Sequence, residues 1–208
     1  MSKIKQKLLN LITLGGYKRR KRPSKLDTYT KDLRELTLNY QTQRLQIEHK
    51  NPLNRYGKKC FSQTDEDGIT IEILRRIGCL EKGSFAEFGP GDGMENNTLI
   101  LKSLGWKGFW VGGEDLVIDF KKSENFSFLK EFVSLKNIFQ LASLGISNIK
   151  CKELDVISFD LDGNDLYLVS ELLKKQFRPK LFIVEYNSKF PPPVQWSIEY
   201  DENHIWDG

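Results

Sequence analysis

Short apolar runs alternate with helical patterns along the second half of the chain. The runs have the length and residue types of buried strands, and the apolar positions between them recur at helical spacing. Strands are expected around Phe85–Phe88, Trp106–Gly112, Asp155–Asp160 and Lys180–Tyr186, and a further strand is expected within Phe126–Ser134, around Glu131–Val133. Helices are expected from just after Ser62 or Thr64 to Ile77, and over Asn97–Leu104, Leu135–Leu144 and Leu166–Phe177. This alternation predicts an α/β fold with a Rossmann-like, doubly wound and mainly parallel sheet.

Local signals mark the ends of these helices. Ser62 or Thr64 is expected to cap the start of the first helix. Gly105 and Gly145 are expected to end the second and third helices, because glycine commonly follows the last helical residue.

The pattern before residue 54 differs from that of the rest of the chain. Apolar residues at helical spacing predict a short amphipathic helix over Lys3–Leu14 and a second, heavily charged helix over Asp27–His49. The basic run Lys18–Arg22 lies between them, either as a solvated linker or as a contact for an anionic partner. We therefore expect a helical, basic N-terminal extension over 1–53 and a Rossmann-like domain over 54–208.

Composition and charge limit the expected location and partners. The 208 residues carry a net charge of +4, and the basic N-terminal region could make a peripheral contact with membrane lipid. The basic run has no interleaved aromatic residues, which argues against nucleic acid. Cys60, Cys79 and Cys151 have no metal-ligand spacing and fit a reducing compartment. The N-terminal apolar stretch is too short to span a bilayer, so a cytoplasmic protein is expected.

The stretch Ser84–Thr98 organises the rest of the domain. An apolar strand runs into a glycine-rich turn and then into a helix, and glycine lets a ligand approach the main chain closely. A dinucleotide-binding turn needs a glycine where Met94 stands, so the pattern is instead acid-x-G-x-G-x-G, with Glu87 as the acid. Ligands of open α/β sheets bind beyond the carboxyl ends of the strands, which places the expected site at this turn.

An acidic residue follows the next strand. Glu114 stands roughly twenty residues beyond the glycines, the distance at which dinucleotide folds place a ribose-binding acid. An ionised carboxylate has two acceptor oxygens and can therefore bind both hydroxyls of a ribose.

The acid-x-G-x-G-x-G pattern resembles motif I of class I S-adenosylmethionine-dependent methyltransferases. Further segments are similar to an FkbM-like branch of these enzymes and run in order from Phe61 to Gly208. They are FSQTDEDG, FAEFGPGDGMENNT, GWKGFWVGGE, ISFDLDGND, FIVEYN and WDG. The resemblance implies transfer of a methyl group to an oxygen of a sugar or glycan-related acceptor.

The resemblance also implies which residues bind S-adenosyl-L-methionine. Glu87 would hold the ammonium group, directly or through water, and Glu114 the ribose. Gln63 and Asp67 would lie near the methionine end, and Asn137, or in its place Ser134, near the adenine. The full set implied is Gln63, Asp67, Glu87, Gly89, Gly91, Gly93, Asn97, Glu114 and Asn137.

The chain departs from the methyltransferase pattern after FIVEYN. Only Ser188–Gly208 remain, too few residues for the helix and antiparallel strand pair that usually follow. We therefore expect a sheet without its last strands, whose edge is exposed or paired with another chain, a second copy or a different partner.

A second polar cluster follows the fourth predicted strand. Asp160 or Asp162 could orient the acceptor or act as general base for its hydroxyl. Asn164, with Glu185 and Asn187 after the fifth strand, is expected to bind the acceptor. A polar turn capped by Asn164 or Asp165 would account for the cluster equally well. The acids could also hold a metal ion, but their spacing fits no complete ligand set, so none is expected.

Two other functions compete with methyl transfer. The chain could be a non-catalytic, Rossmann-like binding protein that acts through its basic N-terminal region. The run DLDGND also resembles the D-x-D-G-T motif of haloacid-dehalogenase-like phosphatases. That motif opens its fold, whereas this run comes late in the chain and has Asn164 in place of threonine.

Overall fold

The structure is a computed structural model that describes residues 24–117, 125–186, 189–190 and 193–204. The chain divides into two compact units, Met1–Gln41 and Thr42–Gly208, each of which is described by itself. The predicted helix over Lys3–Leu14 and the basic run Lys18–Arg22 lie outside the described residues. Among the helices described, none has both the length and the apolar character needed to cross a lipid bilayer.

The long helix α2 spans Lys25–Glu48 and begins at a local capping structure. The Asp27 N–H donates to the Ser24 hydroxyl (3.1 Å), and the Ser24 N–H donates to the Asp27 carboxylate (2.8 Å). This reciprocal pair satisfies backbone donors that a helix start otherwise leaves open, and hydrogen bonding to Ser24 lowers the pKa of Asp27. The helix therefore starts slightly earlier than its apolar pattern predicts. The short 3-10 helix η1 (Pro52–Tyr56) follows it.

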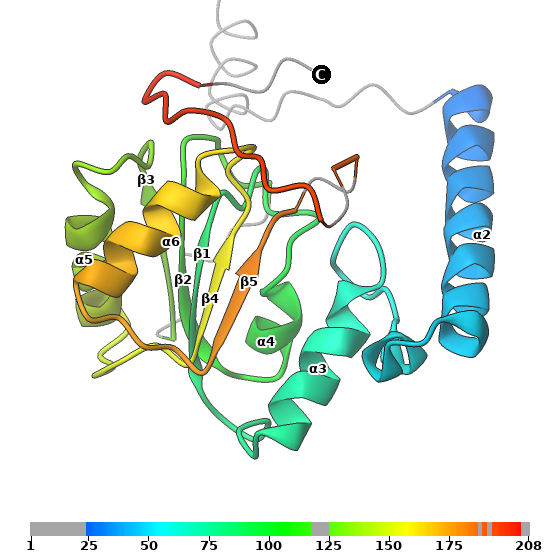
Figure 1. The fold of residues 1–208 in the computed structure, drawn as a ribbon, viewed down its shortest axis with the longest axis horizontal. Helices are drawn as coiled ribbons and strands as arrows, with labels where there is room; N and C mark the ends of the chain where they lie inside the picture. Colours follow the sequence, from blue (N-terminus) through cyan, green and yellow to red (C-terminus); the bar gives the residue numbers. More distant parts are fainter. Residues whose placement is uncertain (1–23, 118–124, 187–188, 191–192, 205–208) are drawn as a thin grey trace, which may run out of the picture. The chain divides into compact units, whose positions relative to one another are not determined.

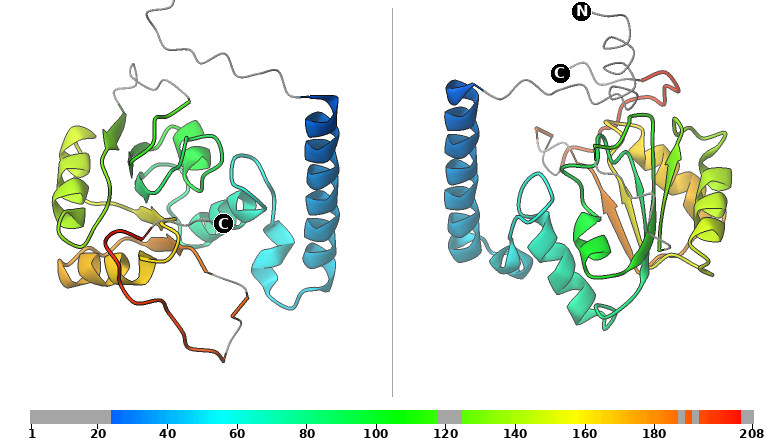
Figure 2. Two further views of the ribbon diagram at one scale, coloured as in Figure 1. Left: turned by 90° about the horizontal axis from the view of Figure 1, so that it is seen from above. Right: turned by 180° about the vertical axis from the view of Figure 1, so that it is seen from behind.

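The Rossmann-like domain contains a five-stranded sheet in which all neighbouring strands are parallel, in the order β3-β2-β1-β4-β5. The strands are β1 (Ser84–Phe88), β2 (Lys107–Gly112), β3 (Phe126–Lys130), β4 (Val156–Phe159) and β5 (Leu181–Val184). The helices are α3 (Glu66–Arg76), α4 (Leu99–Ser103), α5 (Ile138–Asn148) and α6 (Asp165–Lys174). Figures 1 and 2 show α5 and α6 on one face of the sheet and α3 and α4 on the other. The predicted doubly wound α/β fold is confirmed.

The central strand β1 supplies both hydrophobic cores. Ala86 and Phe88 belong to the core under α5 and α6, while Phe85 belongs to the core under α3 and α4. Phe88 stacks on Phe159 of β4 with ring centres 5.0 Å apart. Because both faces of β1 are covered, all five of its residues are buried, which explains a nearly continuous apolar run in place of strict alternation.

The third strand lies within the predicted stretch Phe126–Ser134, but the centre predicted for it at Glu131–Val133 was wrong. β3 lies at Phe126–Lys130, immediately before the predicted Glu131–Val133. Phe126 packs edge-on against Trp110 of β2, with ring centres 5.0 Å apart. This contact between neighbouring strands fixes the position of β3. The local apolar pattern gives no sign of the contact, because it joins residues of two different strands.

Two predicted helix boundaries were also wrong. Gly145 does not end α5, which continues to Asn148. Gly145 is buried there, and a Cβ at this position would overlap the Phe109 ring, so the glycine lets the helix lie close to the sheet. At the start of α3 the cap position is Asp65, and the side chain of Ser62 instead donates to Asp67 (2.9 Å).

β5 lies at the edge of the sheet, as predicted. Leu181, Phe182 and Ile183 are only half-buried and Val184 is exposed. The central strand β1 and the edge strand β5 therefore differ in burial, although both were predicted from similar apolar runs.

We expect Gly145→Ala to lower the free energy of unfolding by about 1 to 3 kcal/mol, because overpacking against Phe109 outweighs a helix-propensity gain of about 1 kcal/mol. Urea unfolding followed by tryptophan fluorescence measures the change. Ser147→Ala, at an exposed position of the same helix, should leave the midpoint unchanged or raise it slightly. An unchanged midpoint for Gly145→Ala would show that the Phe109 ring yields freely.

Candidate functional site

The sheet register brings the predicted acidic residues to one edge. Glu87 of β1 pairs with Ser158 of β4, and Phe159 of β4 pairs with Val184 of β5. Asp160 and Glu185 therefore follow neighbouring strands at corresponding positions. Glu114 follows β2 at the same edge, since all the strands are parallel.

Glu87 is fully buried and joins β1 to the start of α4. Its carboxylate accepts hydrogen bonds from the N–H groups of Asn97 (2.9 Å) and Thr98 (3.1 Å) and from the Thr98 hydroxyl (2.5 Å). The Trp110 indole N–H in turn donates to that hydroxyl (2.8 Å). Burial raises the pKa of Glu87 to about 7, against these hydrogen bonds, which favour the carboxylate. Glu87 thus pins both ends of the glycine turn, and its contact with a ligand stays a prediction.

The glycine turn is closed on one side and open on the other. Gly89 has φ +89°, and a Cβ there would overlap the carbonyl oxygen of Asp160, so this glycine packs the turn directly against the loop after β4. Gly91 has φ +53° and is exposed, and a Cβ there would meet no described residue within 4 Å. The main chain at Gly91 is therefore accessible to a ligand.

Asp67 folds the segment before α3. One carboxylate oxygen accepts from the N–H groups of Cys60, Phe61 and Ser62 at 2.6–2.8 Å. Its other oxygen is buried and has no partner among the residues that the structure describes. Asp67 therefore has a clear structural role, while Gln63 is exposed on the same segment. Their contacts with the methionine end of a cofactor stay predictions.

Asn96 is a buried polar residue that is not among the predicted site residues. Its N–H donates to the carbonyl of Phe61 (3.2 Å), which ties the glycine turn to the segment before α3. Within the described part of the chain, neither the oxygen nor the nitrogen of its side-chain amide has a partner. Buried amides usually have hydrogen-bond partners. The Asn96 side chain differs in this respect from its neighbours in the run of polar residues, and only the structure shows the difference.

The two acids after β2 differ in their contacts. Asp115 forms an ion pair with Lys130 of β3 (2.5 Å). Glu114 is exposed, and none of the described residues forms a hydrogen bond or ion pair with its side chain. Glu114 is therefore free to bind a ligand at the carboxyl end of β2.

The asparagines assigned to the cofactor both have structural partners. The Asn97 amide donates to the Ser158 hydroxyl (3.3 Å). The Asn137 side chain accepts from the Ser134 N–H (2.8 Å) and donates to the Phe132 carbonyl (2.7 Å), which closes the turn before α5. The assignment of Asn137 to the adenine stays a prediction. The two hydrogen bonds of the Asn137 side chain explain the presence of a polar residue here without a ligand.

Three carboxylates gather after β4 and β5. Oxygens of Asp160, Asp162 and Glu185 all lie within 4.8 Å of one another. Burial, together with the charges of Glu185 and Glu87, raises the pKa of Asp160 to about 7. Burial and the charge of Asp165 also raise the pKa of Asp162. A carboxylate with a pKa near neutrality can act as a general base, and three such oxygens could also hold a divalent cation.

Asp165 and Asn164 shape the loop that carries these acids. The Asp165 carboxylate accepts from the N–H groups of Leu161 (3.0 Å) and Gly163 (3.1 Å). Asn164 occupies the N-cap position of α6 but makes no side-chain capping bond. Instead its amide donates to the carbonyl of Asp201 (2.8 Å). Asp165 therefore stabilises the turn before α6, and Asn164 connects the loop to the C-terminal segment, but among the described contacts neither side chain caps the helix as the alternative predicted.

The C-terminal segment 193–204 borders the site, which the sequence pattern did not predict. Figure 1 shows it, in red, running over the carboxyl edge of the sheet. The Tyr167 hydroxyl donates to the Ile198 carbonyl (2.6 Å), and His204 Nε2 lies 2.9 Å from the carbonyl oxygen of Asp162. These contacts hold the segment beside the acidic loop. Asn187, assigned to the acceptor, lies outside the described residues.

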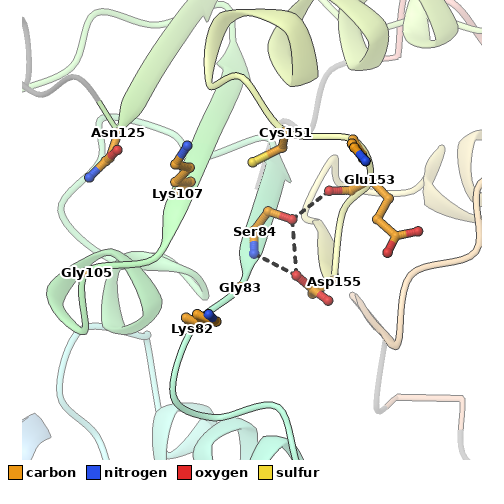
Figure 3. Close-up of a pocket in the computed structure, with 10 residues that line it drawn as sticks. Lys82, Gly83, Ser84, Gly105, Lys107, Asn125, Cys151, Glu153 and Asp155 are labelled. Carbon is orange, nitrogen blue, oxygen red and sulfur yellow. Dashed lines mark hydrogen bonds between the residues drawn. The ribbon is translucent and has the colours of Figure 1, made fainter.

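A separate hollow of about 340 Å³ lies at the opposite edge, where the strands begin (Figure 3). Ser84 lies in it and donates through its N–H to Asp155 (2.8 Å), which also pairs with Lys180 (2.7 Å). Lys82, Lys107 and Lys152 give its lining a basic character. None of the predicted site residues that the structure describes lines it. Because open α/β sheets bind ligands at the carboxyl ends of their strands, we take the carboxyl edge as the candidate site.

The sequence matches no protein-family model and no curated protein. The residues at the carboxyl edge of the sheet are therefore the basis for any function, and the methyltransferase resemblance stays a prediction.

Asp160→Asn should stabilise the protein more at pH 8 than at pH 5. The pKa of this acid is raised from 3.8 to about 7, so the folded state loses stability as pH rises from about 4 to 7. Removing the charge should add about 1 to 2 kcal/mol at pH 8, which allows for partial screening by solvent. Urea unfolding at both pH values measures the gain.

Glu153→Gln is the matched control, because Glu153 is an exposed acid at the opposite edge of the sheet. It should leave the stability unchanged at both pH values. A loss of stability in Asp160→Asn at pH 8 would show that the carboxylate has a stabilising partner.

Proposed function

We propose that this chain is an S-adenosylmethionine-dependent methyltransferase that acts on a hydroxyl of a sugar or glycan-related acceptor. One observation carries the proposal. The carboxyl edge of the sheet combines an accessible glycine turn after β1, an unengaged carboxylate after β2 and an acid of near-neutral pKa after β4. In that order along the chain, these three features would supply a main-chain surface for the cofactor, a hydrogen-bond acceptor for its ribose hydroxyls and a general base.

The residues present fit the cofactor. Gly91 leaves the main chain open to the ligand, and the exposed Glu114 has two acceptor oxygens for the ribose hydroxyls. Glu87 and Asn96 hold the turn from behind. Bound S-adenosyl-L-methionine would supply an electrophilic methyl group.

Asp160 is the proposed base. Because its pKa lies near 7, it can accept the proton of the acceptor hydroxyl near neutral pH, a contribution of about 10²–10⁴-fold to the rate. Asp162 and Glu185 lie beside it and would orient the acceptor, since carboxylates accept hydrogen bonds from sugar hydroxyls. No metal is required by this scheme.

The proposal extends to location and partners. The described cysteines are free, which fits a reducing compartment such as the cytoplasm. The half-buried β5 edge could pair with another chain. Membrane contact through the basic N-terminal region stays a prediction on residues outside the described ones.

Glu114→Ala should weaken binding of S-adenosylhomocysteine at least about tenfold, because one carboxylate bonded to two hydroxyls contributes more than about 1.4 kcal/mol. Isothermal titration calorimetry measures the affinity. Asp115→Ala is the matched control, because Asp115 is the adjacent acid, 88% exposed and paired with Lys130. Equal losses in the two variants would mean that the ribose is misplaced. A folded chain with no detectable binding would favour the non-catalytic alternative.

Asp160→Asn should lower methyl transfer about 10²–10⁴-fold and leave affinity for S-adenosylhomocysteine within about threefold of the parent value. Transfer from labelled S-adenosyl-L-methionine to a panel of sugars measures the rate. Treatment with EDTA should leave the rate unchanged, because no metal takes part. A rate lost on chelation would instead assign the three carboxylates to a divalent cation.

A further inference from the structure

α2 carries a stripe of apolar side chains that is exposed to solvent. None of the residues of this 24-residue helix is buried in the part of the chain that the structure describes. The members of the stripe expose between 61 and 85% of their surface; they are Leu26, Tyr29, Leu33, Leu36, Tyr40 and Ile47. Helices in proteins owe most of their stability to the packing of an apolar face. This stripe therefore needs a partner.

The spacing of the stripe is that of a coiled coil. The intervals along the helix are three, four, three, four and seven residues, with Gln43 standing three residues after Tyr40 and four before Ile47. The result is a heptad pattern with a mean period of 3.5 residues over three heptads, in which every seam position except Gln43 is apolar. A strict stripe of this kind is narrower than the face by which a helix packs on a globular core, and it fits one other helix. Figure 1 shows α2 as one continuous helix over this range.

We propose that α2 forms a two-stranded, parallel and in-register coiled coil with α2 of a second copy of this chain. In that register each apolar side chain of the seam meets its own counterpart, Leu33 against Leu33 and Leu36 against Leu36. Gln43 also meets Gln43, and two amides can donate and accept across the seam. A polar seam residue that pairs only with itself is a known determinant of register.

The residues that flank the seam agree with self-association. In the parallel register Asp32 faces Thr37 of the other helix, and Asn39 faces Arg44. No like charges oppose one another at these positions, and the Asn39 oxygen can accept a hydrogen bond from the Arg44 guanidinium. This interface is separate from the β5 edge, because it uses no residue of the sheet.

The mass of the full chain in solution tests the proposal. Sedimentation or light scattering should give a dimer for the parent chain, and Leu33→Glu with Leu36→Glu should raise the dissociation constant about a hundredfold or more. Glutamate forms helix about as well as leucine, so the change acts on the seam. Leu45→Glu is the matched control, because Leu45 is 42% exposed on the same helix and lies off the seam. It should remain a dimer.

Orientation is tested by cross-linking. Tyr29→Cys should form a disulfide-linked dimer on mild oxidation, because residue 29 lies near one end of the helix and meets its counterpart only in a parallel pair. The parent chain, which contains Cys60, Cys79 and Cys151, is the control. A monomeric parent chain, a dimer that survives both glutamates, or no cross-link through residue 29 would overturn the proposal. The near-ultraviolet circular dichroism of each variant confirms that the sheet is intact.

Discussion

The buried carboxylate of Glu87 holds the candidate site together. The glycine turn leaves β1 after Phe88 and returns at Asn97, where two backbone N–H groups and the Thr98 hydroxyl bind Glu87. The turn is therefore fixed at both ends, and only its middle, at Gly91, is open. An unpaired buried charge would be strongly destabilising. The bond from Trp110 to Thr98 connects this arrangement to the neighbouring strand as well.

The acids at the carboxyl edge would serve the proposed function, but their clustering lowers the stability of the fold. Parallel strands end at the same edge, so Glu87 near the end of β1 and the acids after β4 and β5 come together whether or not their charges repel. Asp160 is affected most, because burial raises its pKa and the charges of Glu185, Glu87, Asp162 and Asp165 raise it further. A site of this kind is less stable than a neutral one, and strongly shifted pKa values are more common at functional sites than elsewhere. In the proposed methyltransferase, the same burial and repulsion that destabilise the folded chain would suit Asp160 to proton transfer near neutral pH.

Much of the site was predictable because it depends on strand ends. Residues that directly follow an apolar run must lie at the edge of a parallel sheet, so Glu114, Asp160 and Glu185 could be placed together from the sequence. The roles of Asp67 and Asn137 were less accessible. A polar residue in a loop can bind a ligand or close its own turn, and only the hydrogen bonds show that both side chains hold local structure. The contact of segment 193–204 with the acidic loop depends on residues such as Tyr167 and His204 that belong to no periodic pattern.

The sequence by itself determined the fold class, the central strand of the sheet and the order in which the candidate site residues follow the strands. These features follow from local patterns, since the apolar run of β1 and the glycines after it need only their own residues to be recognised. The tertiary structure alone decided the place of β3, which depends on the packing of Phe126 against Trp110. It also decided the role of Gly145, which depends on the Phe109 ring beneath it. Contacts between residues distant in the sequence leave no periodic signal, and only the folded chain brings their surfaces together.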